Sequence, residues 1–213
     1  MKNNKTRKVV LASMLAALGM VLGIIEIPYP IAPWLNFDLS EVVVLIATHV
    51  LGLGYALFVI VCKFFVSLLY KGPVGPMAIG QIGAVIASTS ISVGYYYLRK
   101  IKFVKNEKFN LAIVLTITMF IFAMIMFITN YYFITPTYLN GVFTWYSDLP
   151  FAFDINGFNE AYGSNLTVPS WLSFLSPYGQ AIFFIYFPFN FLKGLLSAGV
   201  YMIVKRVEKV IKV

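Results

Sequence analysis

The sequence predicts an all-α integral membrane protein with six transmembrane helices in one compact bundle and both termini in the cytoplasm. Of its 213 residues, 60% are hydrophobic and only 11% are charged, and the mean hydropathy is +0.84. A soluble fold of this length needs more charge to cover its surface. The apolar residues also fall into blocks of about 17 to 25, long enough to cross a hydrocarbon core of about 30 Å as helices. This composition excludes a cytosolic enzyme and a disordered chain, and the single cysteine, Cys62, excludes a disulfide scaffold.

The basic residues cluster at the predicted helix ends. The formal net charge is +8, and thirteen of the sixteen basic residues lie before the first apolar block, in the middle of the chain or after the last block: Lys2, Lys5, Arg7, Lys8, Arg99, Lys100, Lys102, Lys105, Lys108, Lys205, Arg206, Lys209 and Lys212. By the positive-inside rule, all three groups face the cytoplasm. The same charges attract anionic membrane lipid. Because the charge follows the topology, we expect no nucleic-acid partner.

Six spans follow from the apolar blocks and their breaks. In chain order they are Val9–Ile25, Ser40–Gly52, Gly54–Tyr70, Met77–Leu98, Phe109–Phe133, and a last span that is kinked or entered at Pro188 and ends by Val204. The first is not read as a cleaved signal peptide, because no small-residue processing site follows it and more spans do. Prolines between residues 28 and 33 then open a non-helical loop through Asp38.

Later breaks set the remaining boundaries. Ser40 and Glu41 are expected to cap the short second span, and a Gly-Pro-rich turn at 72–76 ends the third. The connection from Ile134 to Ser176 carries three acidic residues and no lysine or arginine, so we expect it outside the cell. Its aromatic residues, Trp145 and Trp171 among them, suit an interfacial belt or a lid. Residues 1–213 are expected to form a single transmembrane domain.

Catalytic motifs are missing from the sequence. His49 is the only histidine, so no paired-histidine zinc site can be built, and no Gly-rich run ends in Gly-Lys-Ser/Thr. We therefore expect no enzyme activity in this chain and no ATP hydrolysis of its own.

Polar residues inside the apolar helices are the candidate functional groups. Each destabilises the protein there unless it has a polar partner or a functional role. Lys193 lies twelve residues before Lys205, about 18 Å above the inner flank. Asn190 shares its helix face, and Asn130 lies high on the fifth span. These three groups could converge in the outer half of the bundle, or they could only join helices. For Lys63, pairing within the bundle is the favoured reading.

The first span also carries small residues four apart, Ala12 and Ala16. Such spacing lets another helix approach closely, since packing drives association in lipid. The spacing alone leaves open whether that helix belongs to a partner or to the same bundle.

Several stretches resemble the S components of energy-coupling-factor vitamin transporters, most closely those of the riboflavin-binding RibU type. The Asn-Tyr…Pro-x-Tyr pattern at 130–138 resembles the end of that family's fifth helix, and Pro188-Phe-Asn-Phe-Leu-Lys-Gly194 resembles its Pro-Phe-Asn-x-x-Lys-Gly motif. Leu35 to Glu41, Lys63 and the spaced alanines of the first helix also match.

The resemblance implies a substrate-binding subunit that captures riboflavin at the outer face of the cell membrane. Asn130, Asn190 and Lys193 would contact the ligand, and Leu35 to Asp38 would form part of the lid. Ala12 and Ala16 would face a transmembrane coupling subunit that carries two cytoplasmic ATPase subunits. These partners would supply the ATP-driven step.

Two departures from the family pattern affect the substrate. Phe64 and Ala84 stand where asparagines are common in the family. The physical chemistry still suits a flavin: Trp34, Tyr131 and phenylalanines could provide a flat slot, and amides could pair with the pyrimidine edge. Lys193 could donate to ribityl hydroxyls or to the phosphate of FMN. Riboflavin, FMN, another vitamin and a ligand-free membrane scaffold therefore all stay open.

Overall fold

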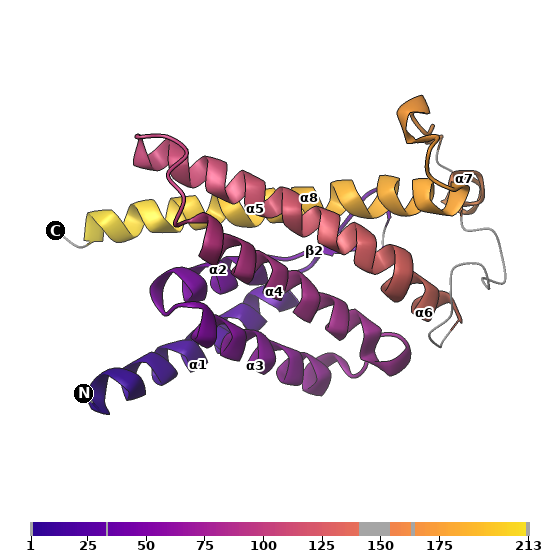
Figure 1. Ribbon diagram of the computed structural model, residues 1–213. Helices are drawn as coiled ribbons and strands as arrows, with labels where there is room; N and C mark the ends of the chain where they lie inside the picture. The colour runs from indigo at the N-terminus through magenta and orange to yellow at the C-terminus, as the bar shows by residue number, and fades with distance from the viewer. Residues whose placement is uncertain (1, 33, 141–153, 163–164, 212–213) are drawn as a thin grey trace.

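The fold is an assembly of long helices that pack side by side, shown as a computed structural model in Figure 1. The structure describes residues 2–32, 34–140, 154–162 and 165–211. Its elements are α1 (Lys2–Ile24), β1 (Ile27–Pro28), β2 (Asn36–Phe37), α2 (Ser40–Val50), α3 (Leu53–Lys71), η1 (Pro76–Ala78), α4 (Ile79–Leu98), α5 (Glu107–Thr129), η2 (Asn130–Ile134), α6 (Thr135–Asn140), α7 (Ile155–Tyr162), η4 (Ser170–Leu172) and α8 (Pro177–Ile211). Residues 141–153 of the predicted outer connection, which include Trp145 and Asp148, lie outside the described ranges, as do residues 163 and 164.

Five helical stretches of the described chain are long and apolar enough to cross a membrane, where six spans are predicted. The remaining predicted span is α2, an apolar helix of only 11 residues. At about 1.5 Å per residue it covers about 16 Å, roughly half of a hydrocarbon core. The predicted order of helices is therefore observed, while the residues that the structure describes contain no sixth helix long enough to span the membrane.

The predicted end of the fifth span is wrong. The helix that begins at Glu107 does not stop at Phe133, because the π-helical turn η2 joins it to α6. Pro136 has no N–H and its ring crowds the carbonyl of residue 132, which a wider π turn accommodates. The last helix begins at Pro177, directly after the predicted outer connection, and continues to Ile211. Pro188 lies inside this helix, so of the two predicted alternatives the entry at Pro188 is excluded.

The loop after α1 forms a small hairpin that positions the later site. Ile27 pairs with Phe37 and Pro28 with Asn36, and the Tyr29 N–H donates to the Leu35 carbonyl over 2.7 Å. The predicted cap of α2 is wrong in detail. Leu39 is the N-cap residue and its side chain makes no capping bond. Asp38 Oδ1 instead accepts from the Ser40 N–H at 2.9 Å.

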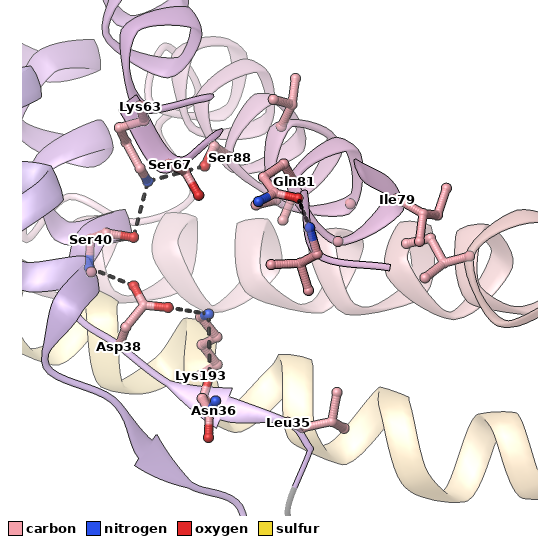
Figure 2. Close-up of a pocket in the computed structure, with 18 of the residues that line it drawn as sticks. Leu35, Asn36, Asp38, Ser40, Lys63, Ser67, Ile79, Gln81, Ser88 and Lys193 are labelled. Atoms are coloured by element: carbon pink, nitrogen blue, oxygen red, sulfur yellow. Dashed lines mark hydrogen bonds and ion pairs between the residues drawn. The ribbon is translucent and has the colours of Figure 1, made fainter. Parts of the chain in front are cut away.

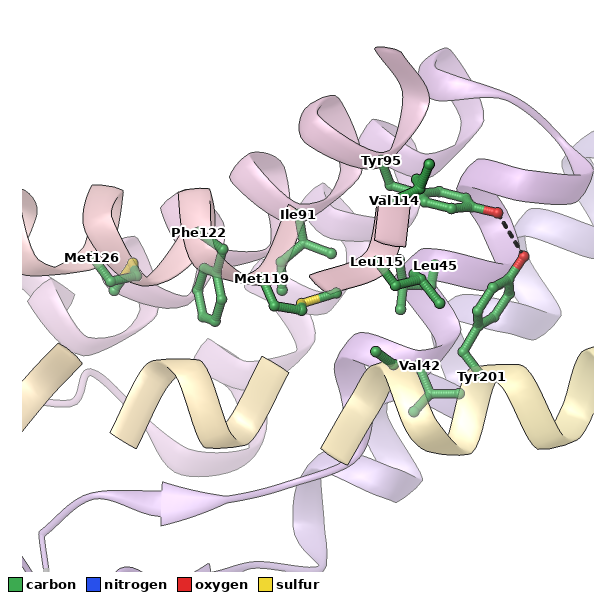
Figure 3. Packing of buried hydrophobic residues seen from close by; sticks show 11 residues of the cluster. Val42, Leu45, Ile91, Tyr95, Val114, Leu115, Met119, Phe122, Met126 and Tyr201 are labelled. Atoms are coloured by element: carbon green, nitrogen blue, oxygen red, sulfur yellow. Dashed lines mark hydrogen bonds between the residues drawn. The ribbon is translucent and has the colours of Figure 1, made fainter. Parts of the chain in front are cut away.

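The largest core cluster lies between α5 and α8 and extends to α2 and α4 (Figure 3). Met119 and Phe122 of α5 are fully buried there. Nearby, the hydroxyls of Tyr95 and Tyr201 hydrogen-bond at 2.8 Å. Gly194 lies against Met119 so closely that a Cβ atom at this position would come within 3.0 Å of the Met119 Cβ. The glycine of the motif therefore permits tight packing of α8 on α5.

The two chain ends and the connection between α4 and α5 lie at the same end of the bundle (Figure 1). The turn between α3 and α4 lies at the opposite end, together with α6 and α7. Three groups of basic residues are thus gathered at one end, as the charge pattern predicts.

Candidate ligand-binding cavity

A cavity of about 630 Å³ opens between α1, the hairpin loop, α3, α4, η2 and α8. This volume falls within the range of sites for drug-sized molecules, which are mostly apolar with a few placed polar groups. Ile60, Ile79, Met126 and Phe189 are among its apolar walls. Figure 2 shows that polar side chains from several elements meet on one side of it.

Lys193 of α8 and Asp38 of the hairpin loop form an ion pair in the cavity wall. Lys193 Nζ lies 2.6 Å from Asp38 Oδ2 and 3.4 Å from the Asn36 carbonyl oxygen. The two side chains are 18% and 14% exposed. The charge of Lys193 is therefore already matched by a carboxylate of the protein itself.

The environment of Asp38 favours its ionised form. Burial alone would raise the pKa of this carboxyl, but the Lys193 charge and the hydrogen bonds from Lys193 and Ser40 outweigh it, with a further contribution from Lys63. Together they lower the pKa of Asp38 from 3.8 to about 2. Asp38 is thus ionised at neutral pH.

Asn130 and Asn190 bring two amides to the same cavity from different helices. Each Nδ2 donates to the carbonyl four residues earlier on its own helix, Met126 or Tyr186, over 2.7 Å. Among the described residues, neither Oδ1 accepts a hydrogen bond. Each amide therefore has an acceptor and a second hydrogen left for a ligand.

A second polar group, which we call the Lys63 cluster, consists of Ser40, Glu41, Lys63 and Ser88. Lys63 Nζ donates to Ser40 Oγ at 3.0 Å, to Glu41 Oε1 at 3.2 Å and to Ser88 Oγ at 3.4 Å. Ser88 Oγ also donates to Glu41 Oε1 at 2.7 Å. The pairing of Lys63 inside the bundle, predicted from the sequence, is confirmed. The cluster joins α2, α3 and α4 beside the cavity.

A third ion pair lies at the more exposed rim. Lys71, the last residue of α3, pairs with Glu26 after α1, and Asn36 Nδ2 donates to Glu26 Oε2 at 3.0 Å. On the facing wall, Gln81 accepts from the Val74 N–H and donates to the Gly72 carbonyl. These contacts fix the hairpin loop and the α3–α4 turn around the opening.

All five residues predicted to bind ligand lie in the wall of this one cavity: Leu35, Asp38, Asn130, Asn190 and Lys193. The structure thus brings them together from the hairpin loop, η2 and α8. Trp34, Phe64 and Ala84 line the same cavity, so the two positions at which the resemblance implies asparagines present apolar groups here. Tyr131 does not line it and packs against Tyr178, with ring centroids 5.1 Å apart.

Ala12 and Ala16 lie on the inner face of α1 in this structure, whereas the resemblance implies that they face a coupling subunit. They are 0% and 6% exposed and belong to a cluster with Ala47, Ala56 and Val59 of α2 and α3. In this conformation the small residues serve packing within the bundle, and they have no free surface to offer a partner subunit.

Sequence reasoning missed Glu41 and Ser88 as cavity residues. Glu41 reads as a helix cap at the membrane surface, yet it is 4% exposed. Lys63 could have pointed to Glu41, because a lysine within an apolar helix requires a carboxylate from a neighbouring element. Ser88 gives no signal, since serine is common between packed membrane helices.

Comparisons with known proteins agree with this architecture. Residues 7–205 match the family model described as ECF transporter, substrate-specific component. The riboflavin transporter FmnP of Bacillus subtilis (strain 168) is 29% identical over 68% of this chain and 73% of its own length. The riboflavin transporter RibU of Staphylococcus aureus (strain TCH60) is 29% identical over 65% of this chain and 69% of its own.

The fold itself also has a solved counterpart. An S component of a bacterial ECF transporter superposes with a TM-score of 0.66, covering 98% of this chain and 99% of that one at 21% identity. The family match spans nearly the whole chain, and the same helices build the cavity described above. The chain is a multi-pass membrane protein that belongs to the family of ECF transporter substrate-specific components.

Proposed function

We propose that this S component captures riboflavin in the cavity at the outer face of the cell membrane. The observation that carries the proposal is the convergence of Asn130, Asn190 and the Asp38–Lys193 pair on one largely apolar cavity. An isoalloxazine ring needs flat apolar walls, and its pyrimidine edge needs alternating donors and acceptors, which amides provide. The riboflavin transporters that resemble the chain support the same ligand.

Riboflavin suits the cavity better than FMN does. Each of the three cavity lysines, Lys63, Lys71 and Lys193, is paired with a carboxylate. A phosphate, which carries about −1.5 to −2 charges at pH 7, would have to displace one of these carboxylates or lie beside it. FMN is therefore the second candidate ligand.

Transport would depend on other subunits, because the sequence contains no phosphate-binding loop. We infer a transmembrane coupling subunit and two cytoplasmic ATPase subunits as partners. In this proposal residues 1–213 act as one substrate-binding domain, with both termini and the basic α4–α5 connection in the cytoplasm. The surface that meets the coupling subunit would differ from the buried face of Ala12 and Ala16.

Thermal unfolding of the purified protein with a panel of vitamins tests the ligand assignment. A ligand at 100 times its dissociation constant stabilises the folded state by about 2.7 kcal/mol. Riboflavin should raise the melting temperature at micromolar concentration, while biotin and thiamine should not. A rise with another vitamin and none with riboflavin would reject the flavin assignment, and no rise with any small molecule would favour a ligand-free scaffold.

A further inference from the structure

The Lys63 cluster has hydrogen-bonding capacity that the protein itself does not use. Glu41 is 4% exposed, lines the cavity, and its Oε2 is buried without a hydrogen-bond partner among the described residues. Ser67 of α3 lines the cavity next to the cluster (Figure 2), and no described residue bonds its hydroxyl. Buried polar groups in native proteins are nearly always paired. The unused groups therefore indicate a missing polar partner at this wall.

The chemistry of the cluster specifies what that partner is. The Lys63 ammonium has three donors, and Ser40, Glu41 and Ser88 accept one hydrogen bond each. No donor of Lys63 is left for an anion, and the Glu41 carboxylate would repel one. The remaining groups are an acceptor oxygen and rotatable hydroxyls, which match neutral hydroxyl groups that donate and accept at once.

The amides of Asn130 and Asn190 present a different chemistry in the same cavity. They are planar, each is anchored to its own helix through Nδ2, and together they suit the fixed edge of a heteroaromatic ring. The cavity thus has one polar group suited to a ring edge and another suited to a flexible chain of hydroxyls. A continuous chain of contacts connects the two walls, from Lys193 through Asp38 and Ser40 to Lys63.

We propose that the Lys63 cluster, together with Ser67, is the subsite for the polyhydroxylated chain of the ligand. This inference rests on the proposed function, in which the ligand is a flavin whose ring carries a ribityl chain. Ser88 and Ser67 accept from or donate to the chain hydroxyls, and Glu41 Oε2 accepts from one of them. Lys63 acts as a positioning residue, because it holds Ser40, Glu41 and Ser88 in place.

Riboflavin and lumiflavin provide the test, since they share the ring but lumiflavin has a methyl group in place of the ribityl chain. Their dissociation constants are measured on the full-length protein in detergent, for the wild type, Ser67→Ala and Ser88→Ala. Each substitution should weaken riboflavin binding by about tenfold, the effect of losing one hydrogen bond, and leave lumiflavin binding within about twofold. Unchanged lumiflavin binding also shows that the variant is folded.

Ser90→Ala is the matched control. Ser90 lies on the same helix, donates to the Ala87 carbonyl and does not line the cavity, so neither flavin should be affected. Equal losses for riboflavin and lumiflavin, or no loss for either, in both Ser67→Ala and Ser88→Ala would overturn the polyol subsite. If the wild type binds neither flavin, the proposed function fails, which is a separate result.

Discussion

The Lys193 ammonium lies 2.6 Å from the Asp38 carboxylate, although the two residues are 155 positions apart in the sequence. This ion pair joins α8 to the hairpin loop at the wall of the cavity. Asp38 also accepts from the Ser40 N–H and so connects the pair to α2. The position of the loop and the wall of the cavity are therefore linked through one carboxylate.

Removing only one charge of this pair should lower the free energy of unfolding more than removing both charges. Lys193→Met leaves the Asp38 carboxylate buried without its counter-charge and should destabilise the protein by about 3 kcal/mol. The double variant Lys193→Met with Asp38→Asn should recover part of the loss. Unfolding in detergent measures both changes, and strictly additive losses would show that the two residues are not coupled.

Acid should remove the contribution of Asp38 to stability. Its pKa is lowered from 3.8 to about 2 in the folded protein, so the stabilisation is complete above about pH 4 and is lost as the pH falls towards 2. The shift corresponds to about 2 kcal/mol. Melting temperatures between pH 6 and 2 should show this loss in the wild type and a smaller one in Asp38→Asn. Identical pH profiles would contradict the assignment.

The buried and the exposed ion pairs should contribute differently to the free energy of unfolding. The side chains of Lys63 and Glu41 are 15% and 5% exposed, while those of Lys71 and Glu26 are 32% and 33% exposed. Lys63→Met should therefore cost about 3 kcal/mol of unfolding free energy and Lys71→Met less than about 1 kcal/mol. Chemical denaturation of both variants measures the difference, and equal losses would show that the Lys63 cluster is not a buried network.

The motif glycine offers a test of helix packing. A Cβ atom on Gly194 would meet Met119 Cβ at 3.0 Å, whereas one on Gly199 of the same helix meets nothing within 4 Å. Gly194→Ala should thus destabilise the protein by about 1 to 3 kcal/mol. Gly199→Ala is the matched control and should be neutral or stabilising, because alanine favours the helix. A neutral Gly194→Ala would mean that α5 and α8 are not held this close.

The sequence predicts most of the helices because apolar blocks and breaking residues are local signals. The Gly-Pro turn after α3 and the proline-rich loop after α1 are examples. The π turn at Asn130–Ile134 and the continuation of the chain into α6 were missed. A proline at position 136 or 188 signals a local disturbance, but the neighbouring helices decide whether the helix ends there or continues.

The candidate site was partly predictable for a related reason. Lys193 and the two asparagines stand out because a polar group within an apolar helix costs free energy unless it has a hydrogen-bond partner or a functional role. Their partners do not stand out: Asp38 and Glu41 read as loop and cap residues, and only the tertiary structure brings them to the lysines. The burial of Ala12 and Ala16 likewise depends on which face of α1 meets α3. The spacing of small residues is the same whether they pack inside the bundle or against a partner helix, so the sequence does not distinguish the two.

Titration of riboflavin fluorescence with the purified protein tests the central claim most directly. The wild type should quench the fluorescence saturably with one flavin per chain, and Asn130→Ala and Asn190→Ala should each weaken binding by about tenfold or more. Asn156→Ala, on the exposed face of α7, is the matched control and should bind like the wild type. Absence of saturable quenching by folded wild-type protein, or amide variants that bind riboflavin as tightly as the control, would contradict a flavin site in this cavity.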